Sequence, residues 1–115
     1  MALIFGNVLQ DFYKRKKTGS LFAVVNRNTE HTVRFYFVKG EIHHLSFGTL
    51  RGNECLERLN SYDFGMAVFC NGLRPPRSFL SDLPETEKVI EAVKSMKKTI
   101  RGIRFAERGR NPTYN

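Results

Sequence analysis

An antiparallel hairpin over residues 31–47 is the feature that most constrains the fold of this chain. Apolar side chains alternate with polar ones along residues 31–38, so one face of a strand there is apolar. Lys39-Gly40 follows, and glycine readily adopts the positive φ that a tight hairpin turn needs. Residues 41–47 then form the returning strand. The sequence therefore predicts two paired strands with one face directed at a core.

Two further apolar runs extend the predicted sheet. Residues 20–26 form a β-branched and aromatic strand before the hairpin, and residues 66–70 form another after it, closed by Asn71-Gly72. We expect an α+β fold in which about four strands form an antiparallel meander sheet.

Two short helices are expected around these strands. Apolar residues at steps of four predict an N-terminal helix over residues 3–13, although Gly6 weakens it by about 1 kcal/mol relative to alanine. The basic residues 14–17 suit the negative end of its dipole. A short middle helix is expected over residues 51–60. Its inward-facing side chains are those of Cys55, Leu56 and Leu59.

The C-terminal segment predicts a long amphipathic helix over residues 83–105. Asp82 and Glu85, three residues apart, match a capping box at its start. Burying five apolar side chains on one stripe contributes on the order of 8–12 kcal/mol, so the stripe packs either on this domain or on a partner, including a second copy. The stripe follows steps of 4, 3, 4 and 3 through Val89, Val93, Met96, Ile100 and Ile103.

The positive charge of the chain is concentrated near its C-terminus. The formal net charge is +8, and residues 94–110 contain seven basic side chains and one acidic one, against twelve and ten elsewhere. This surface is either solvated or binds an acidic protein, a membrane surface, nucleic acid or a cyclic dinucleotide. Its candidate anion-binding residues are Lys94, Lys97, Lys98, Arg101, Arg104 and Arg108, extended by Arg74 and Arg77.

The length of 115 residues is that of one domain. We expect a body over residues 1–82, the terminal helix over 83–105 and a frayed basic tail over 106–115. No segment reaches the ~18 apolar residues of a membrane helix, and the basic run follows the first apolar residues, unlike the order in a signal peptide. Two cysteines at this spacing form neither a disulfide framework nor a zinc motif. We therefore expect a cytoplasmic protein.

No group of residues predicts catalysis, a cofactor or a metal. His43 and His44 are neighbours on a strand, so their rings point to opposite faces and cannot chelate one ion. We expect one imidazole to be half-buried and the other exposed. Neither Cys55 nor Cys70 has a histidine beside it, and the chain contains no nucleophile motif and no phosphate-binding glycine loop. An enzyme built on Cys55 or His43 would instead require a deep pocket around a perturbed thiol or imidazole.

Several motifs follow one another in a characteristic order along residues 17–69. Residues 17–22 read Lys-Thr-Gly-Ser-Leu-Phe, and residues 35–44 read Phe-Tyr-Phe-Val-Lys-Gly-Glu-Ile-His-His. They resemble the K-T-G-x-L start and the strand pair I-Y-F-x-x-G-x-I-x-H-A of a bacterial domain found at the N-terminus of PatA-type response regulators. Residues 51–56 resemble its G-x-x-A-L helix, with Cys55 in place of alanine. Residues 64–69 are similar to its G-x-F strand.

This resemblance covers residues 3 to about 80 and implies a regulatory or adaptor module in bacterial signalling, around surface motility, without catalytic residues. Residues 83–110 lie outside it, and the 115 residues contain no receiver domain. We expect a non-enzymatic module of a two-component system that binds protein partners and self-associates through its C-terminal helix. The alternative is an anion-binding module that uses the basic C-terminal segment to bind nucleic acid or a nucleotide second messenger.

Overall fold

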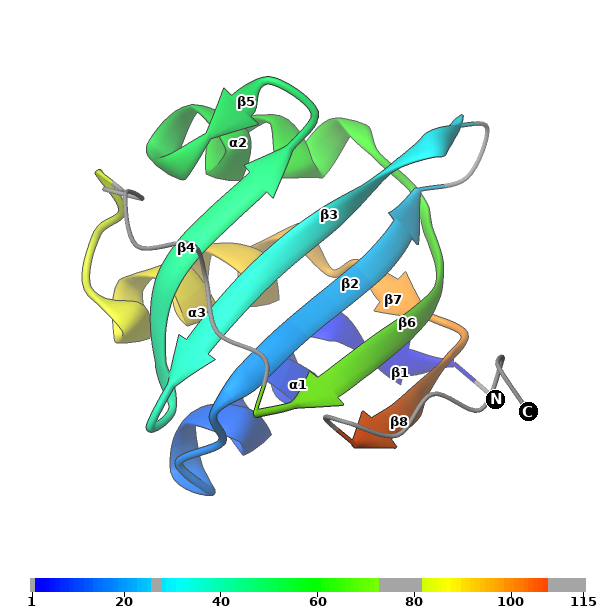
Figure 1. Ribbon diagram of the computed structural model, residues 1–115. Coiled ribbons are helices and arrows are strands. Elements are labelled where there is room, and N and C mark those ends of the chain that lie inside the picture. The colour runs from blue at the N-terminus through cyan, green and yellow to red at the C-terminus, as the bar shows by residue number, and fades with distance from the viewer. Residues whose placement is uncertain (1, 26–27, 73–81, 108–115) are drawn as a thin grey trace.

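The computed structural model shows an α+β fold and describes residues 2–25, 28–72 and 82–107 (Figure 1). A six-stranded sheet has the order β5-β4-β3-β2-β6-β8, and a second sheet pairs β1 with β7. The helices are α1 (Phe5–Lys14), α2 (Gly52–Arg58), extended by a 3₁₀ turn at Leu59–Ser61, and α3 (Thr86–Met96). The strands are β1 (Leu3–Ile4), β2 (Gly19–Val25), β3 (Asn28–Val38), β4 (Glu41–Phe47), β5 (Leu50–Arg51), β6 (Phe64–Asn71), β7 (Thr99–Ile100) and β8 (Gly102–Glu107).

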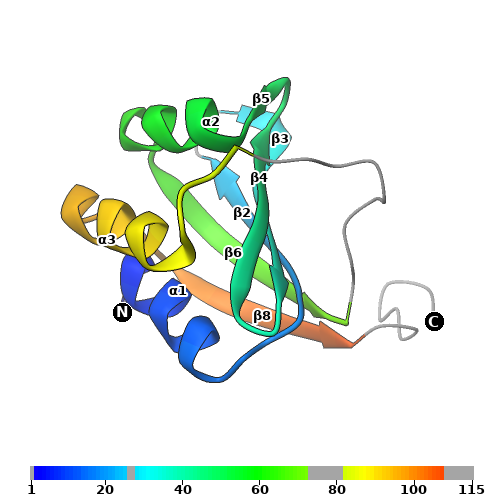
Figure 2. The same cartoon turned by 90° about the vertical axis from the view of Figure 1, so that its left-hand side faces the viewer.

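All three helices lie on one face of the six-stranded sheet, which Figure 2 shows nearly edge-on. Side chains that alternate along the strands therefore divide into a helix-covered set and a set on the opposite face, on which no described helix lies. The predicted hairpin is confirmed, because β3 and β4 pair antiparallel around Lys39 and Gly40. Both turn residues have positive φ, 50° and 87°, as a tight hairpin turn requires.

The predicted four-stranded meander is only partly correct. Strands β2, β3 and β4 follow one another as expected, but β6 pairs with β2 and not with β4. Strand β8 then pairs with β6 in parallel, so the sheet is mixed. The helix α2 carries the chain across the helix-covered face, and this crossing returns it to the opposite edge of the meander (Figure 1).

The predicted long C-terminal helix is wrong, because α3 ends at Met96. Lys97 adopts a left-handed conformation with φ of 56°, and its N–H donates to the carbonyl of Lys94 at 3.1 Å. Such a residue ends a helix. The chain then enters β7, where Ile100 pairs with Leu3 of β1. The apolar spacing continues past Met96, but these later residues belong to strands.

The predicted capping box is also wrong, because Asp82 caps α2 instead. Its Oδ1 accepts a hydrogen bond from the N–H of Asn53 at 2.9 Å. Helix α3 starts after Glu85, whose side chain makes no capping hydrogen bond. Thr86 fixes this end of α3 to the sheet, since its Oγ1 accepts from the N–H of Ile42 and donates to Oε1 of Glu41, both at 2.9 Å.

The core lies between the helices and the covered face of the sheet, and aromatic rings form its centre. Phe5 of α1 makes edge contacts with Phe35 and Phe64, at centroid distances of 5.6 and 5.0 Å. Phe12, two turns later, contacts Phe37 at 5.5 Å. Such pairs each contribute about 0.5–1.5 kcal/mol beyond their buried area. The predicted inward residues of α2 are confirmed, since Cys55, Leu56 and Leu59 are buried in the same core.

Candidate functional site

A groove of about 540 Å³ separates α1 from the outer strand β8 and is lined mostly by apolar side chains. We call it the α1–β8 groove. One wall comes from the N-terminal segment and α1, and the other comes from β8. It is lined by Ala2, Leu3, Ile4, Asn7, Val8, Asp11, Phe12, Ile103 and Phe105.

The groove gathers three of the large apolar side chains that remain exposed on this protein. Phe105 is 61% exposed, Ile4 48% and Leu3 41%. Soluble monomers rarely expose a contiguous apolar patch without a use for it, and patches rimmed by polar residues mark binding surfaces. Their meeting in one hollow therefore makes the groove the strongest candidate for a docking surface.

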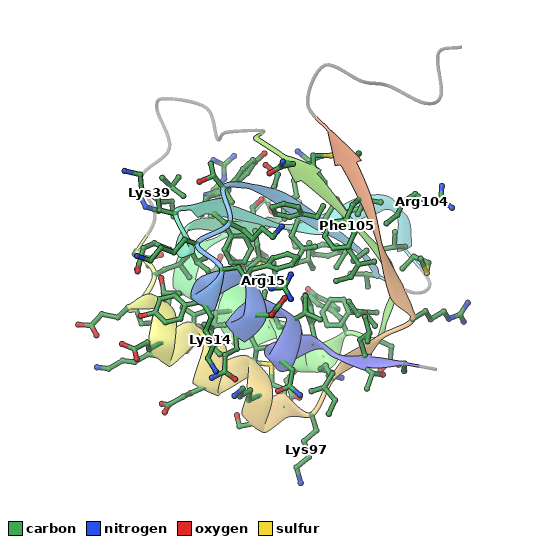
Figure 3. The ribbon with its side chains drawn as sticks, turned by 90° about the horizontal axis from the view of Figure 1, so that it is seen from below. Lys14, Arg15, Lys39, Lys97, Arg104 and Phe105 are labelled. Carbon is green, nitrogen blue, oxygen red and sulfur yellow. The ribbon has the colours of Figure 1, made fainter. Side chains whose placement is uncertain are left out.

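The register of β8 sets the direction in which Phe105 points. It pairs with Phe69 in the parallel ladder, so both side chains lie on the helix-covered side of the sheet. The Phe105 ring approaches those of Phe69 and Phe12 at centroid distances of 6.1 and 6.4 Å. It lies past the edge of the core and remains mostly in solvent. Figure 3 shows it on the side of β8 that faces α1, with Arg104 on the other side.

Backbone groups add to the binding capacity of the groove. Strand β8 is the last in the order of the six-stranded sheet, and among the described residues no strand pairs with its outer edge. Alternate N–H and carbonyl groups of Gly102–Glu107 therefore face away from the sheet. Such an edge pairs readily with another extended chain.

Cations lie near both walls of the groove. The end of α1 carries the basic run Lys14–Lys17, and Nζ of Lys17 lies 6.0 Å from the centre of the Phe105 ring. Exposed Arg101 precedes β8 at the other wall, and Arg104 extends from the side of β8 opposite Phe105 (Figure 3). The carboxylate of Asp11 is the one acid in the lining, and it is already paired with Arg15 at 3.1 Å. Lys14 and Arg15 lie along α1 in Figure 3. The groove thus presents an apolar floor within a positive rim.

The apolar stripe expected of the terminal helix is used inside this chain. Val89, Val93 and Ile100 are buried in the core, each 1% exposed or less. Met96 and Ile103 are partly buried against the same core. Because α3 packs on this domain's own α1 and sheet, these five residues form no free stripe for a partner helix.

The basic residues proposed as an anion-binding face do not share one face. Nζ of Lys94 donates to Oε1 of Gln10 on α1, and Nζ of Lys98 lies 3.6 Å from Oδ1 of Asp63. Lys97 is exposed at the end of α3. Of the other two described residues, Arg101 directly precedes β8 and Arg104 belongs to it. Arg74, Arg77 and Arg108 lie outside the described residues.

The thiols and imidazoles do not form a reactive centre in the described part of the chain. Burial raises the pKa of the Cys55 thiol to about 12, so it stays protonated and unreactive at neutral pH. His43 is exposed, whereas His44 is buried with its ring 5.3 Å from that of Tyr36. No cluster of three or more potential metal ligands occurs among the described residues.

Leu3, Ile4 and Phe105 were not identified as site residues from the sequence. Leu3 and Ile4 are two apolar residues ahead of the amphipathic pattern of α1, which is a weak local signal. The only signal for Phe105 in the sequence is that it is an aromatic residue within a charged segment. Their common location depends on the parallel pairing of β6 with β8, which the sequence pattern does not reveal.

No protein-family model matches the chain, and no match was found among curated proteins or solved structures. Within the described residues, no helix has the length and apolar character needed to cross a membrane.

Proposed function

We propose that this chain is a non-enzymatic regulatory module that binds a protein partner through the α1–β8 groove. The observation that carries the proposal is the exposure of Phe105, Ile4 and Leu3 together in one hollow. The resemblance of residues 3–80 to the N-terminal domain of PatA-type response regulators supports a place in bacterial signalling. A module of this kind acts in the cytoplasm, so we expect the protein there.

The occupant of the groove is an extended, acidic segment of another protein that carries apolar side chains. The outer edge of β8, with which no strand pairs among the described residues, supports pairing with an extended chain, which gains main-chain hydrogen bonds there. The hollow accepts every second side chain of such a strand. The rim of Lys14–Lys17, Arg101 and Arg104 favours acidic side chains between the apolar ones.

The charge of the rim argues against a second copy of the chain as the occupant. Two copies paired along β8 would bring Arg101 and Arg104 of both chains close together. Like charges facing each other across an interface oppose association. The net charge of +8 adds repulsion over longer distances. Self-association through α3 is not supported either, since its apolar side chains are buried within the chain.

Partner capture with matched variants tests the proposal. The full chain, Phe105→Asp and Met66→Asp serve as baits, because Met66 is an apolar side chain that is 42% exposed but lies outside the groove. The same acidic protein should be captured by the wild-type chain and by Met66→Asp, and its recovery should fall at least about tenfold with Phe105→Asp. Equal capture by all three baits would show that the groove is not the docking surface.

A defined peptide removes the dependence on an unknown partner. One peptide alternates glutamate with valine and isoleucine, and its counterpart carries lysine in place of each glutamate. In nuclear magnetic resonance titrations, the acidic peptide should shift the amide signals of Leu3, Ile4 and residues 102–106, and the basic peptide should not. Shifts confined to other surfaces, or equal binding of both peptides, would contradict the proposal.

A further inference from the structure

A second hollow, on the opposite side of the sheet from the helices, has a different chemistry. It has a volume of about 620 Å³ and lies over β3, β4 and β5. Among the described residues, its lining contains two arginines and four hydroxyl groups, and no aspartate or glutamate. We call it the β3–β5 pocket. Its polar lining residues are Arg34, Arg51, Thr32, Tyr36, Ser46, Thr49 and His44.

The two arginines are brought together by the register of three neighbouring strands. Ser46 of β4 pairs with Arg34 of β3 on one side and with Arg51 of β5 on the other. Adjacent strands lie about 4.8 Å apart, so the two arginine backbones are about 10 Å apart with Ser46 between them. Long side chains at that spacing reach a common point above β4. Both guanidinium groups can therefore approach one position above Ser46 from opposite sides.

The orientation of Arg34 is supported by an aromatic contact. Its guanidinium lies 5.6 Å from the centre of the Phe22 ring, on the neighbouring strand β2. Stacking on an aromatic face leaves the N–H groups at the edge of the guanidinium available to a ligand. Phe22 thus holds the charged group over the sheet without neutralising it.

The buried imidazole of His44 lies close enough to both arginines for their charges to affect it. The pKa of His44 is lowered from 6.5 to about 4, chiefly by burial and then by the positive charges of Arg51 and Arg34. Its ring is therefore neutral at pH 7 and adds no third charge. A neutral imidazole both donates and accepts hydrogen bonds. The described lining thus combines two positively charged side chains with several neutral hydrogen-bonding groups.

We propose that the β3–β5 pocket binds a small organic molecule through a phosphate group, which Arg34 and Arg51 hold from two sides. A phosphate monoester offers three terminal oxygens, which can satisfy two guanidinium forks and the hydroxyl of Ser46 together. The volume lies within the roughly 300–1,000 Å³ of sites for small organic ligands. The phosphate therefore belongs to a larger body, for which Tyr36 supplies an aromatic wall.

The row of residues across the face opposite the helices supplies a matched control. Arg104 belongs to the same cross-strand row, which runs from Arg51 through Ser46, Arg34, Phe22 and Val68 to Arg104. It has the same charge and the same face of the sheet, but it lies outside the pocket lining. If substitution of Arg34 or Arg51 weakens binding and substitution of Arg104 does not, the effect is therefore due to the pocket and not to the general positive charge.

Calorimetric titration of the full chain at low salt tests the proposal, with adenosine 5′-monophosphate, ribose 5-phosphate and uncharged adenosine as probes. Both phosphate monoesters should bind the wild-type chain, and adenosine should bind at least about tenfold more weakly. Arg34→Gln and Arg51→Gln should each weaken binding at least about tenfold, and Arg104→Gln less than about twofold. Phe105→Asp should leave this binding unchanged, which separates the outcome from that of the α1–β8 groove.

Three results would overturn the proposal. The first is no binding of either phosphate monoester by the wild-type chain at millimolar concentration. The second is equal weakening by Arg104→Gln, which would indicate a diffuse positive surface suited to a single-stranded nucleic acid. The third is a titration of the wild-type chain with adenosine 5′-monophosphate in which the amide signals that shift do not include those of Ser46 and Thr49. This result does not depend on any variant.

Discussion

A Cβ atom on Gly6 would lie 2.8 Å from both the backbone nitrogen and the Cα of Lys94. This relationship shows that α1 and α3 pack with their backbones in close approach at one point. The glycine that weakens α1 as an isolated helix is therefore required by the contact between the two helices. The contact also determines where the N-terminal segment lies, and hence the wall of the α1–β8 groove formed by Leu3 and Ile4.

The first prediction concerns this contact. Gly6→Ala should lower the free energy of unfolding by about 1–3 kcal/mol, because the strain of forcing α1 away from Lys94 exceeds the gain of about 1 kcal/mol in helix propensity. The exposed neighbour Asn7 provides the control, and Asn7→Ala should be neutral or slightly stabilising. Urea denaturation of both variants measures the difference. A more stable Gly6→Ala would show that the helices are free to separate.

The second prediction is a dependence of stability on pH that comes from His44. The pKa of this imidazole is about 4 in the folded protein, against 6.5 for an ordinary histidine, mainly because the ring is buried. Between these values the unfolded chain binds a proton and the folded chain does not. The free energy of unfolding therefore falls as the pH is lowered through this interval, by up to about 3 kcal/mol from this group.

Urea denaturation at several pH values, with wild type and His44→Gln side by side, measures that contribution. The difference in unfolding free energy between the two proteins should shrink as the pH falls from about 7 to about 4. Other groups that titrate affect both proteins and cancel in the difference. A constant difference across this range would mean that the His44 ring is not shielded from protonation.

The third prediction concerns the two thiols. Burial raises the pKa of Cys55 to about 12 and that of Cys70 to a smaller extent, and Cys55 is fully buried whereas Cys70 is partly exposed. A thiol-specific disulfide reagent at pH 8 should modify Cys70 slowly and Cys55 only when the chain unfolds. In the Cys70→Ser variant, the remaining thiol should react at the rate of unfolding. Rapid modification of Cys55 in the folded Cys70→Ser variant would instead support an enzyme that uses this cysteine.

Local patterns predicted those parts of the fold in which local forces decide the structure. The alternation around Phe35 and the positive φ available to Gly40 are sufficient for the β3–β4 hairpin, and the confirmed strands follow from such signals. The same reasoning failed at Ile100. A step of four residues is compatible with a helix, and the choice of a strand there depends on pairing with Leu3, almost a hundred residues earlier.

The sequence pattern failed to predict the capping partner of Asp82 and the location of Phe105 for the same reason. The nearest helix start in the sequence follows Asp82, but its carboxylate caps α2 through Asn53, 29 residues away. Phe105 enters a groove because β8 pairs with β6 in parallel and passes beside α1. Both outcomes depend on long-range packing, which single-sequence periodicity does not encode.

The fourth prediction concerns the attachment of α3 to the sheet. Thr86→Val should lower the free energy of unfolding by about 1–3 kcal/mol, because the buried N–H of Ile42 loses its acceptor and Glu41 loses its donor. Valine preserves the shape of the side chain, so the loss reports the hydrogen bonds. Thr99→Val, at an exposed position of β7, should change stability by less than about 0.5 kcal/mol. Equal effects of the two substitutions would show that the hydrogen bonds at Thr86 make no specific contribution.

The fifth prediction separates folding from binding at the edge of the sheet. Phe69 and Phe105 occupy paired positions on β6 and β8, but Phe69 is fully buried and Phe105 is mostly exposed. Phe69→Ala should cost about 3–5 kcal/mol of stability, as expected for a core aromatic residue. Phe105→Ala should cost less than about 1 kcal/mol of stability, since the substitution removes only the peripheral contacts of this ring with Phe12 and Phe69. Thermal unfolding of the two variants measures both values. A large loss with Phe105→Ala would mean that this ring serves the fold, and its exposure would no longer argue for a docking surface.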